Sequence, residues 1–113
     1  MRELKFRAWC KFDKVMKSAV TIHQLVDMAI PVKVAADYEF MQYIGLKDKN
    51  GVNIYEGDIV AIEMSSSIYL CEIVFYNGKY LAKEKYKIFD FIEIADLVKV
   101  VGNVYENPDL LEK

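Results

Sequence analysis

The sequence predicts a mainly β protein with one helix, and three observations support this prediction. Short apolar segments with strand-like alternation follow one another through most of the chain. Turn signals rich in Gly and Asn separate these segments. Five or six short strands with glycines at the corners favour a small antiparallel barrel, and an SH3-like barrel fits best. We expect one domain over 1–113, with an N-terminal hairpin-plus-helix side lobe in 1–38, the barrel in 39–106 and a tail in 107–113.

The N-terminal segment predicts a β-hairpin. Residues 4–9 alternate apolar and charged side chains, which places Arg7 and Trp9 together on the polar face of a strand. A polar turn at 11–14 leads into a short antiparallel strand at 15–16. This hairpin is the first part of the expected side lobe.

One helix is expected after the hairpin. Residues 21–29 carry apolar side chains at i, i+3, i+4 and i+7 spacing, and Pro31 ends the pattern. The single histidine, His23, falls on this helix. No further ligand or triad member accompanies it, so we interpret it as an ordinary polar side chain.

The central stretch, residues 41–60, organises the predicted sheet. The segment 48–51, Asp-Lys-Asn-Gly, is the strongest turn signal in the chain, and its glycine is expected to hold a positive φ. Strands are expected before it at 39–45 and after it at 52–55. A third extended run follows at 59–63.

The C-terminal half predicts further antiparallel strands. Residues 68–75 are apolar on both faces, which favours a central position in the sheet. The Asn-Gly pair at 77–78 predicts a tight turn, after which 79–87 should pair back as one extended segment. Residues 90–93 match a capping box and predict a short helical turn before Leu97. A final strand is expected at 98–105.

Composition excludes several classes of protein. The formal charge of −2 argues against binding nucleic acid through overall charge, and 54% hydrophobic residues argue against disorder. The longest apolar run, residues 28–32, is too short to cross a membrane, and the N-terminus has no signal-peptide pattern. Cys10 and Cys71 are isolated thiols without metal or redox spacing. We therefore expect a cytoplasmic protein in a bacterial host cell, with no membrane association.

Three segments of the chain, 7–9, 41–60 and 101–111, resemble the YopX family of phage and prophage proteins. The residues that carry the resemblance are Arg7, Trp9, Tyr43, Gly45, Gly51, Tyr55, Gly57, Asp58, Gly102, Asn103 and Tyr105. The resemblance implies a mostly β fold with an SH3-like barrel and a phage or prophage origin, and it implies no reaction. Family members often carry Asp after Arg-Ala-Trp, whereas this chain has Cys10, so no carboxylate role is carried over to that position.

The sequence gives no catalytic, metal or cofactor site. Glu56 and Asp58 flank a glycine, where acidic side chains typically accept hydrogen bonds from local backbone amides. The segment around Asp48 and Asn50 lacks the first and last ligands of a calcium loop. We expect no enzyme activity and no cofactor, and an enzyme with an unrecognised site is only the third hypothesis.

The favoured hypothesis is an accessory protein that acts as an interaction module. It would bind a protein partner or a second copy of itself, as a homo-oligomer, through Trp9, Phe12 and Met16. The alternative is a nucleic-acid-binding module that uses a basic strip. Its candidate contacts are Lys79, Tyr80, Lys83, Lys85, Tyr86 and Lys87, with the four lysines on one face of a strand and the tyrosines on the other.

Overall fold

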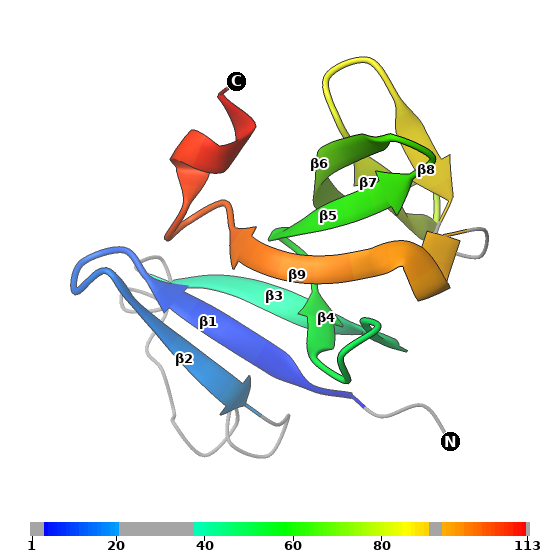
Figure 1. Ribbon diagram of the computed structural model, residues 1–113. Coiled ribbons are helices and arrows are strands. Elements are labelled where there is room, and N and C mark those ends of the chain that lie inside the picture. Colours follow the sequence, from blue (N-terminus) through cyan, green and yellow to red (C-terminus); the bar gives the residue numbers. More distant parts are fainter. Residues whose placement is uncertain (1–3, 21–37, 91–93, 113) are drawn as a thin grey trace.

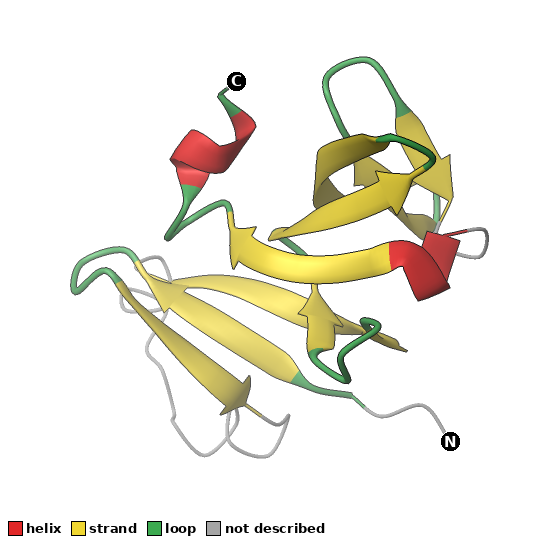
Figure 2. Ribbon diagram, viewed as in Figure 1, coloured by secondary structure: helices red, strands yellow, loops and turns green. Residues whose placement is uncertain are grey.

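The computed structural model describes residues 4–20, 38–90 and 94–112. In this part of the chain the strands form two antiparallel sheets, which lie one above the other in Figures 1 and 2. Helical structure is limited there to two short 3-10 turns, η1 (Ala95–Leu97) and η2 (Pro108–Leu111). The mainly β prediction is confirmed. The helix predicted over 21–29 lies outside the described residues.

The first sheet has the strand order β2-β1-β3-β4. Its strands are β1 (Phe6–Cys10), β2 (Val15–Val20), β3 (Tyr38–Lys47) and β4 (Asn53–Tyr55). The predicted N-terminal hairpin is confirmed, because β1 pairs with β2 across a turn in which Lys14 has a φ of 56°. β1 also pairs with β3, so the sheet continues across the predicted boundary between side lobe and barrel at 38–39.

The turn between β3 and β4 is the one predicted from Asp-Lys-Asn-Gly. Gly51 has a φ of +82°, a conformation that a side chain with a Cβ rarely adopts. The Gly51 N–H donates to the Asp48 carbonyl at 3.0 Å, which closes the turn. The local sequence was therefore sufficient to locate this hairpin.

The second sheet has the order β8-β7-β6-β5-β9. Its strands are β5 (Asp58–Met64), β6 (Ser67–Tyr76), β7 (Lys79–Lys83), β8 (Ile88–Asp90) and β9 (Val98–Asn103). The predicted central strand is β6, which pairs with β5 and β7. The tight turn before β7 is also confirmed, since Asn77 and Gly78 both have positive φ, 51° and 81°.

One local prediction in this sheet is wrong and a second is confirmed in part. The extended segment predicted over 79–87 breaks after Lys83, where the Glu84 N–H donates to the Lys87 carbonyl at 2.9 Å and closes a turn. The short helical turn predicted before Leu97 is present as η1, whereas Asp90, the first residue of the predicted capping box, belongs to the β7–β8 ladder and residues 91–93 lie outside the described ranges. η1 has Ile94 at its N-cap and no side-chain cap.

A cluster of buried apolar side chains among the described residues joins the two sheets. Ile44 of β3 and Ile54 of β4 contribute the first sheet's share of this core. The second sheet contributes Val60, Ile62, Cys71, Ile73, Ala82 and Val98, together with Ile94 before η1. Burying an aliphatic side chain of this size stabilises a fold by about 1.5–3 kcal/mol, so the curl of the second sheet over β3 and β4 is largely held by apolar packing.

The chain turns back after β9. The strand ends at Asn103, earlier than the predicted end at Tyr105, because the Asn103 side-chain oxygen accepts a hydrogen bond from the Tyr105 N–H at 3.0 Å. A Cβ on Gly102 would lie 2.6 Å from the Asn107 side-chain oxygen, so the glycine allows this close turn. η2 then contacts β6, so the predicted tail, 107–113, contains a packed helical turn.

Candidate functional site

Arg7 lies buried between the two sheets. Its Nη2 atom is 2.7 Å from the Asp58 Oδ1 atom and donates to the Glu56 carbonyl at 3.2 Å. Its guanidinium carbon lies 4.8 Å from the centre of the Tyr55 ring, a cation–π distance. The expectation that Arg7 occupies the polar face is therefore wrong, because an ion pair and an aromatic ring compensate its burial.

Asp58 is the acidic partner in this junction and is only 1% exposed. Its Oδ2 atom accepts a hydrogen bond from the Tyr55 N–H at 2.8 Å, which confirms the predicted local role of this carboxylate. Burial raises the pKa of Asp58 above its ordinary value, although the Arg7 charge and the Tyr55 amide act in the opposite direction. The Oδ1 atom has a close ion pair but no hydrogen bond of favourable geometry.

Glu56 and Asp58 do not form a pair of catalytic acids. The Glu56 Oε1 atom accepts a hydrogen bond from the Gln42 N–H at 2.9 Å, on β3. Asp58 binds the Tyr55 amide and the Arg7 side chain. Each carboxylate is thus occupied by its own structural partner, which supports the structural interpretation made from the sequence.

Several residues that carry the family resemblance gather around the same junction. Trp9 stacks on Tyr105 with the ring centres 5.7 Å apart, and Tyr43 packs on Tyr55 at 5.8 Å. A Cβ on Gly57 would lie 3.6 Å from the Tyr105 ring. We define this set as the Arg7–Asp58 junction. It comprises Arg7, Trp9, Tyr43, Tyr55, Gly57, Asp58, Asn103 and Tyr105.

Asp48 is a second buried carboxylate, at the turn between β3 and β4. Its side chain accepts hydrogen bonds from the Asn50, Val52 and Val100 N–H groups at 2.8–2.9 Å. Burial by itself would raise the pKa of Asp48, but these backbone bonds outweigh it and the pKa is lowered. The Val100 bond ties the turn to β9, so Asp48 has a structural function.

The candidate protein interface divides into two parts. Trp9 and Met16 lie opposite each other on β1 and β2 and are both half-buried, and Trp9 already stacks on Tyr105. Phe12 is 86% exposed, and Val15 beside it is also exposed. We define Phe12 and Val15, with the turn residues between them, as the hairpin tip. Of the three predicted interface residues, Phe12 is the one that lies fully exposed.

The strand part of the basic strip is engaged within the protein. Lys79 forms an ion pair with Asp90 at 3.1 Å, and the Tyr80 hydroxyl donates to the Gln42 side chain at 3.3 Å. Tyr80 also packs against the apolar core. Lys83 is exposed at the end of β7.

The other basic-strip residues lie in the turn after β7. Lys87 donates to the Tyr69 hydroxyl at 2.9 Å, and Lys85 lies 5.4 Å from the centre of the Tyr86 ring. Tyr86 is 82% exposed. The prediction that the four lysines share one strand face is wrong, because the backbone turns between Glu84 and Lys87.

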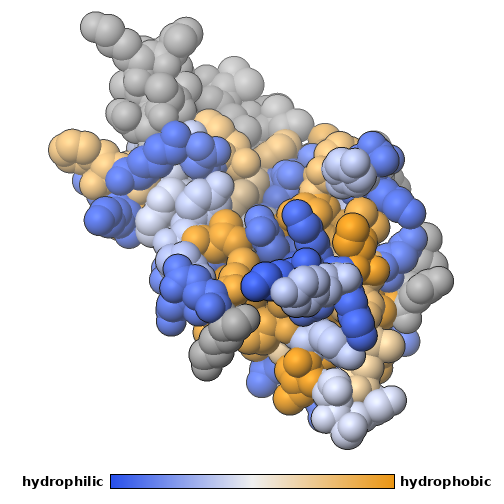
Figure 3. Space-filling view, turned by 90° about the horizontal axis from the view of Figure 1, so that it is seen from above, coloured by the Kyte–Doolittle hydropathy of each residue, from blue (hydrophilic) through white to orange (hydrophobic). Residues whose placement is uncertain are grey.

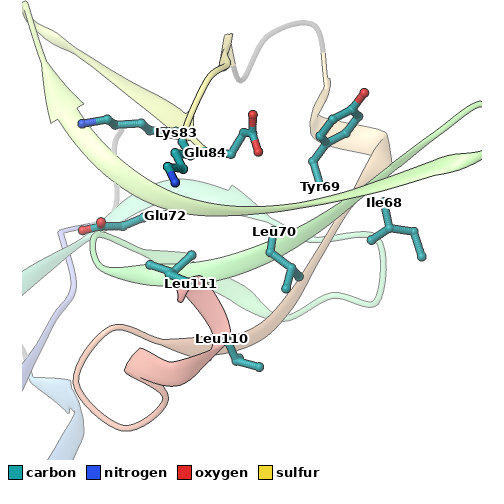
Figure 4. Close-up of a pocket in the computed structure, with 9 residues that line it drawn as sticks. Ile68, Tyr69, Leu70, Glu72, Lys83, Glu84, Leu110 and Leu111 are labelled. Atoms are coloured by element: carbon teal, nitrogen blue, oxygen red, sulfur yellow. The ribbon is translucent and has the colours of Figure 1, made fainter. Parts of the chain in front are cut away.

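A surface hollow of about 460 Å³ lies between β6, the turn after β7, and η2. Figure 4 shows Leu70 extending from β6 to the side on which η2 carries Leu110 and Leu111. Its lining comprises Ile68, Tyr69, Leu70, Glu72, Lys83, Glu84, Lys85, Leu110 and Leu111. Sequence reasoning missed this hollow, because its two apolar walls lie some forty positions apart and no local pattern connects them.

The remaining reactive groups of the described residues form no site of their own. Cys10 and Cys71 are buried free thiols, and burial raises the pKa of Cys71 to about 12. The described ranges contain no cluster of three side chains that could hold a metal ion, and His23 falls outside them. No helix within the same ranges is long and apolar enough to cross a bilayer.

Comparison with known proteins agrees with the resemblance seen in the sequence. The family profile described as YopX protein matches residues 5–112, nearly the whole chain. Among solved structures, the chain is similar to the crystal structure of protein EF1440 from Enterococcus faecalis, with a TM-score of 0.74 and 27% sequence identity over 98% of this chain and 99% of that chain. No curated protein sequence matches it. Because the profile matches residues 5–112, the chain belongs to the YopX family.

Proposed function

We propose that this chain is a non-enzymatic accessory protein of a phage or prophage, and that it binds a second copy of itself or another protein through the hairpin tip. Its setting would be the cytoplasm of the bacterial host. The observation that carries the proposal is the exposure of Phe12, 86% of which faces solvent. The SH3-like form of the curled second sheet belongs to the same proposal.

The backbone of the hairpin tip is held by hydrogen bonds, which supports a role for the side chain that it exposes. The Lys14 N–H donates to the Cys10 carbonyl at 2.8 Å, and the Asp13 N–H points at the Cys10 sulfur at 3.4 Å. Lys14 adopts a positive φ to close the turn. These contacts fix the backbone on both sides of Phe12, so little further ordering would be needed on binding.

Burial of this ring would supply a substantial driving force. Fully burying a Phe side chain is worth about 1.5–3 kcal/mol. The face seen in Figure 3 carries patches of hydrophobic residues bordered by hydrophilic ones, and protein interfaces typically combine an apolar centre with a polar rim. We therefore assign Phe12 as the anchor, Val15 as its neighbour, and Trp9 and Met16 as the support beneath them.

Analytical ultracentrifugation at micromolar concentration tests this proposal. The wild-type protein should sediment as an oligomer, and Phe12→Ser should weaken the association. Tyr76→Ser is the matched control, because Tyr76 is an exposed aromatic residue at the far end of β6. If the protein is monomeric and Phe12→Ser changes neither self-association nor capture of a co-expressed phage protein, the hairpin tip is not the binding surface.

A second candidate function is binding of single-stranded nucleic acid. The exposed Tyr86 ring lies beside Lys85, and Lys83 and Lys87 flank it in sequence, a combination of charge and stacking surface that suits single strands. Fluorescence anisotropy with a labelled oligothymidylate should show binding that weakens with salt and in Tyr86→Ala. Binding that is insensitive to both changes would exclude this surface.

A further inference from the structure

We infer that the hairpin tip of one copy docks into the hollow beside η2 of a second copy, so that the protein assembles head to tail. This inference rests on the proposed self-association and specifies its geometry. It joins an exposed aromatic ring and a surface hollow that is lined in part by leucine and isoleucine side chains.

The hollow has the size and lining for an aromatic side chain. A cavity of about 150 Å³ with apolar walls admits a benzene ring, and this hollow measures about 460 Å³. Leu70, Leu110 and Leu111 supply apolar walls, and Ile68 extends them onto the surface. The remaining volume accommodates an aliphatic neighbour of the ring, such as Val15.

The charges around the two surfaces are complementary. Asp13 and Lys14 follow Phe12 directly and are both exposed. The rim of the hollow carries Glu72 and Lys83, which lie opposite each other on β6 and β7. Among the described residues, no carboxylate forms an ion pair with Lys83. Glu84 and Lys85 also line the hollow, so a docked tip brings a carboxylate and an ammonium group to a surface that carries two of each.

The tip and the hollow are different surfaces of the molecule. The hairpin tip joins β1 and β2 in the first sheet, whereas the hollow lies on the second sheet and η2. No residue of the tip lines the hollow within the described chain. An interface between two unlike surfaces is heterologous, so it leaves a free tip at one end and a free hollow at the other. Assembly would then continue into a ring or a linear array.

Two blocked variants provide the test. Phe12→Asp removes the anchor but keeps the hollow. Ile68→Asp places a charge in the hollow but keeps the tip, and the fold should tolerate it because Ile68 is 66% exposed. Each variant alone should be monomeric at concentrations where the wild type assembles. An equimolar mixture should form a dimer of one copy of each, and nothing larger.

The outcomes separate this inference from the proposed function. Assembly that is lost in Phe12→Asp but unchanged in Ile68→Asp would overturn the docking geometry and leave the hairpin tip as an interface with something else. Assembly unchanged in Phe12→Asp would overturn both. A wild-type protein that remains monomeric would overturn the inference, while capture of a partner protein through Phe12 would still support the proposed function.

A charge exchange tests the predicted contact between Asp13 and Lys83. The single changes Asp13→Lys and Lys83→Asp should each weaken assembly, by about tenfold in Kd if the pair is desolvated. A double variant that carries both changes in one chain again has opposite charges across every interface, so it should recover the wild-type affinity. Failure of the double variant to recover, with its fold intact by circular dichroism, would contradict this orientation of the tip.

Discussion

The Arg7–Asp58 junction and the hairpin tip lie toward the two ends of β1, but they differ in what they expose to solvent. The junction buries an ion pair and stacks aromatic rings between the sheets, and the tip exposes a phenylalanine on a rigid turn. The residues that carry the family resemblance are concentrated in the junction. The hairpin tip lies outside the three segments that carry the resemblance, and the hollow is lined partly from outside them and partly by Leu110 and Leu111 of the last one. The comparison teaches that the residues of the junction hold the two sheets together, whereas the apolar side chains proposed for binding lie on the surface.

The largest effect should come from breaking the junction. Asp58→Ala leaves the buried guanidinium of Arg7 without its counter-charge, so we expect the free energy of unfolding to fall by about 3–5 kcal/mol. Urea unfolding followed by circular dichroism measures this loss. Arg7→Met is the matched control and should cost less at acidic pH, because the Asp58 carboxyl can take up a proton whereas a guanidinium cannot release one. If the two variants lose the same free energy of unfolding at every pH, the expected difference between an unpaired Arg7 and an unpaired Asp58 does not exist.

The next effect concerns the central turn. Gly51→Val places a β-branched side chain at a φ of +82° and should destabilise the protein by roughly 1–3 kcal/mol. The space around this position is open, so the cost is one of backbone conformation alone. Gly51→Asn is the control and should cost less, because Asn tolerates this region. An unchanged melting temperature in the Val variant would mean that the turn does not need its glycine.

A smaller effect should appear in the pH dependence of stability. The pKa of Asp48 is lowered by folding, so its contribution is present above 3.8, its ordinary pKa, and is lost as the pH falls through the folded value. Asp58 acts with the opposite sign: its raised pKa gives a contribution that is present below 3.8 and lost as the pH rises through the folded value. Urea unfolding of wild type and Asp48→Asn should therefore differ most at neutral pH and converge in acid. A difference independent of pH would contradict the assignment.

The smallest effect on stability should occur at the hairpin tip. Phe12→Ser removes a side chain that is 86% exposed, so the free energy of unfolding should change by no more than about 0.5 kcal/mol. Measurement must be made below the concentration at which the protein assembles. If Phe12→Ser lowers the free energy of unfolding as much as Asp58→Ala does, the tip contributes to the core and does not differ from the junction in this respect.

The local features of the fold were predictable from the sequence. The turns at Gly51 and at Asn77 and Gly78 depend on residues that tolerate positive φ, and strand alternation depends on neighbouring side chains. The role of Asp58 as an acceptor for a nearby amide is local for the same reason. Family membership followed from motifs in which these local features stand in one register.

Contacts between distant residues were decided only by the tertiary structure. Arg7 reads as a surface residue because alternation cannot reveal a carboxylate that lies fifty-one positions away in sequence and 2.7 Å away in space. The break at Glu84 and the capping of β9 by Asn103 depend on hydrogen bonds that compete with the extended chain. The hollow requires η2 to fold back onto β6. Sequence periodicity indicates which face of a strand a residue occupies. It does not indicate which distant side chain will compensate a buried charge, or where two distant segments will enclose a hollow, because both depend on how the whole chain folds.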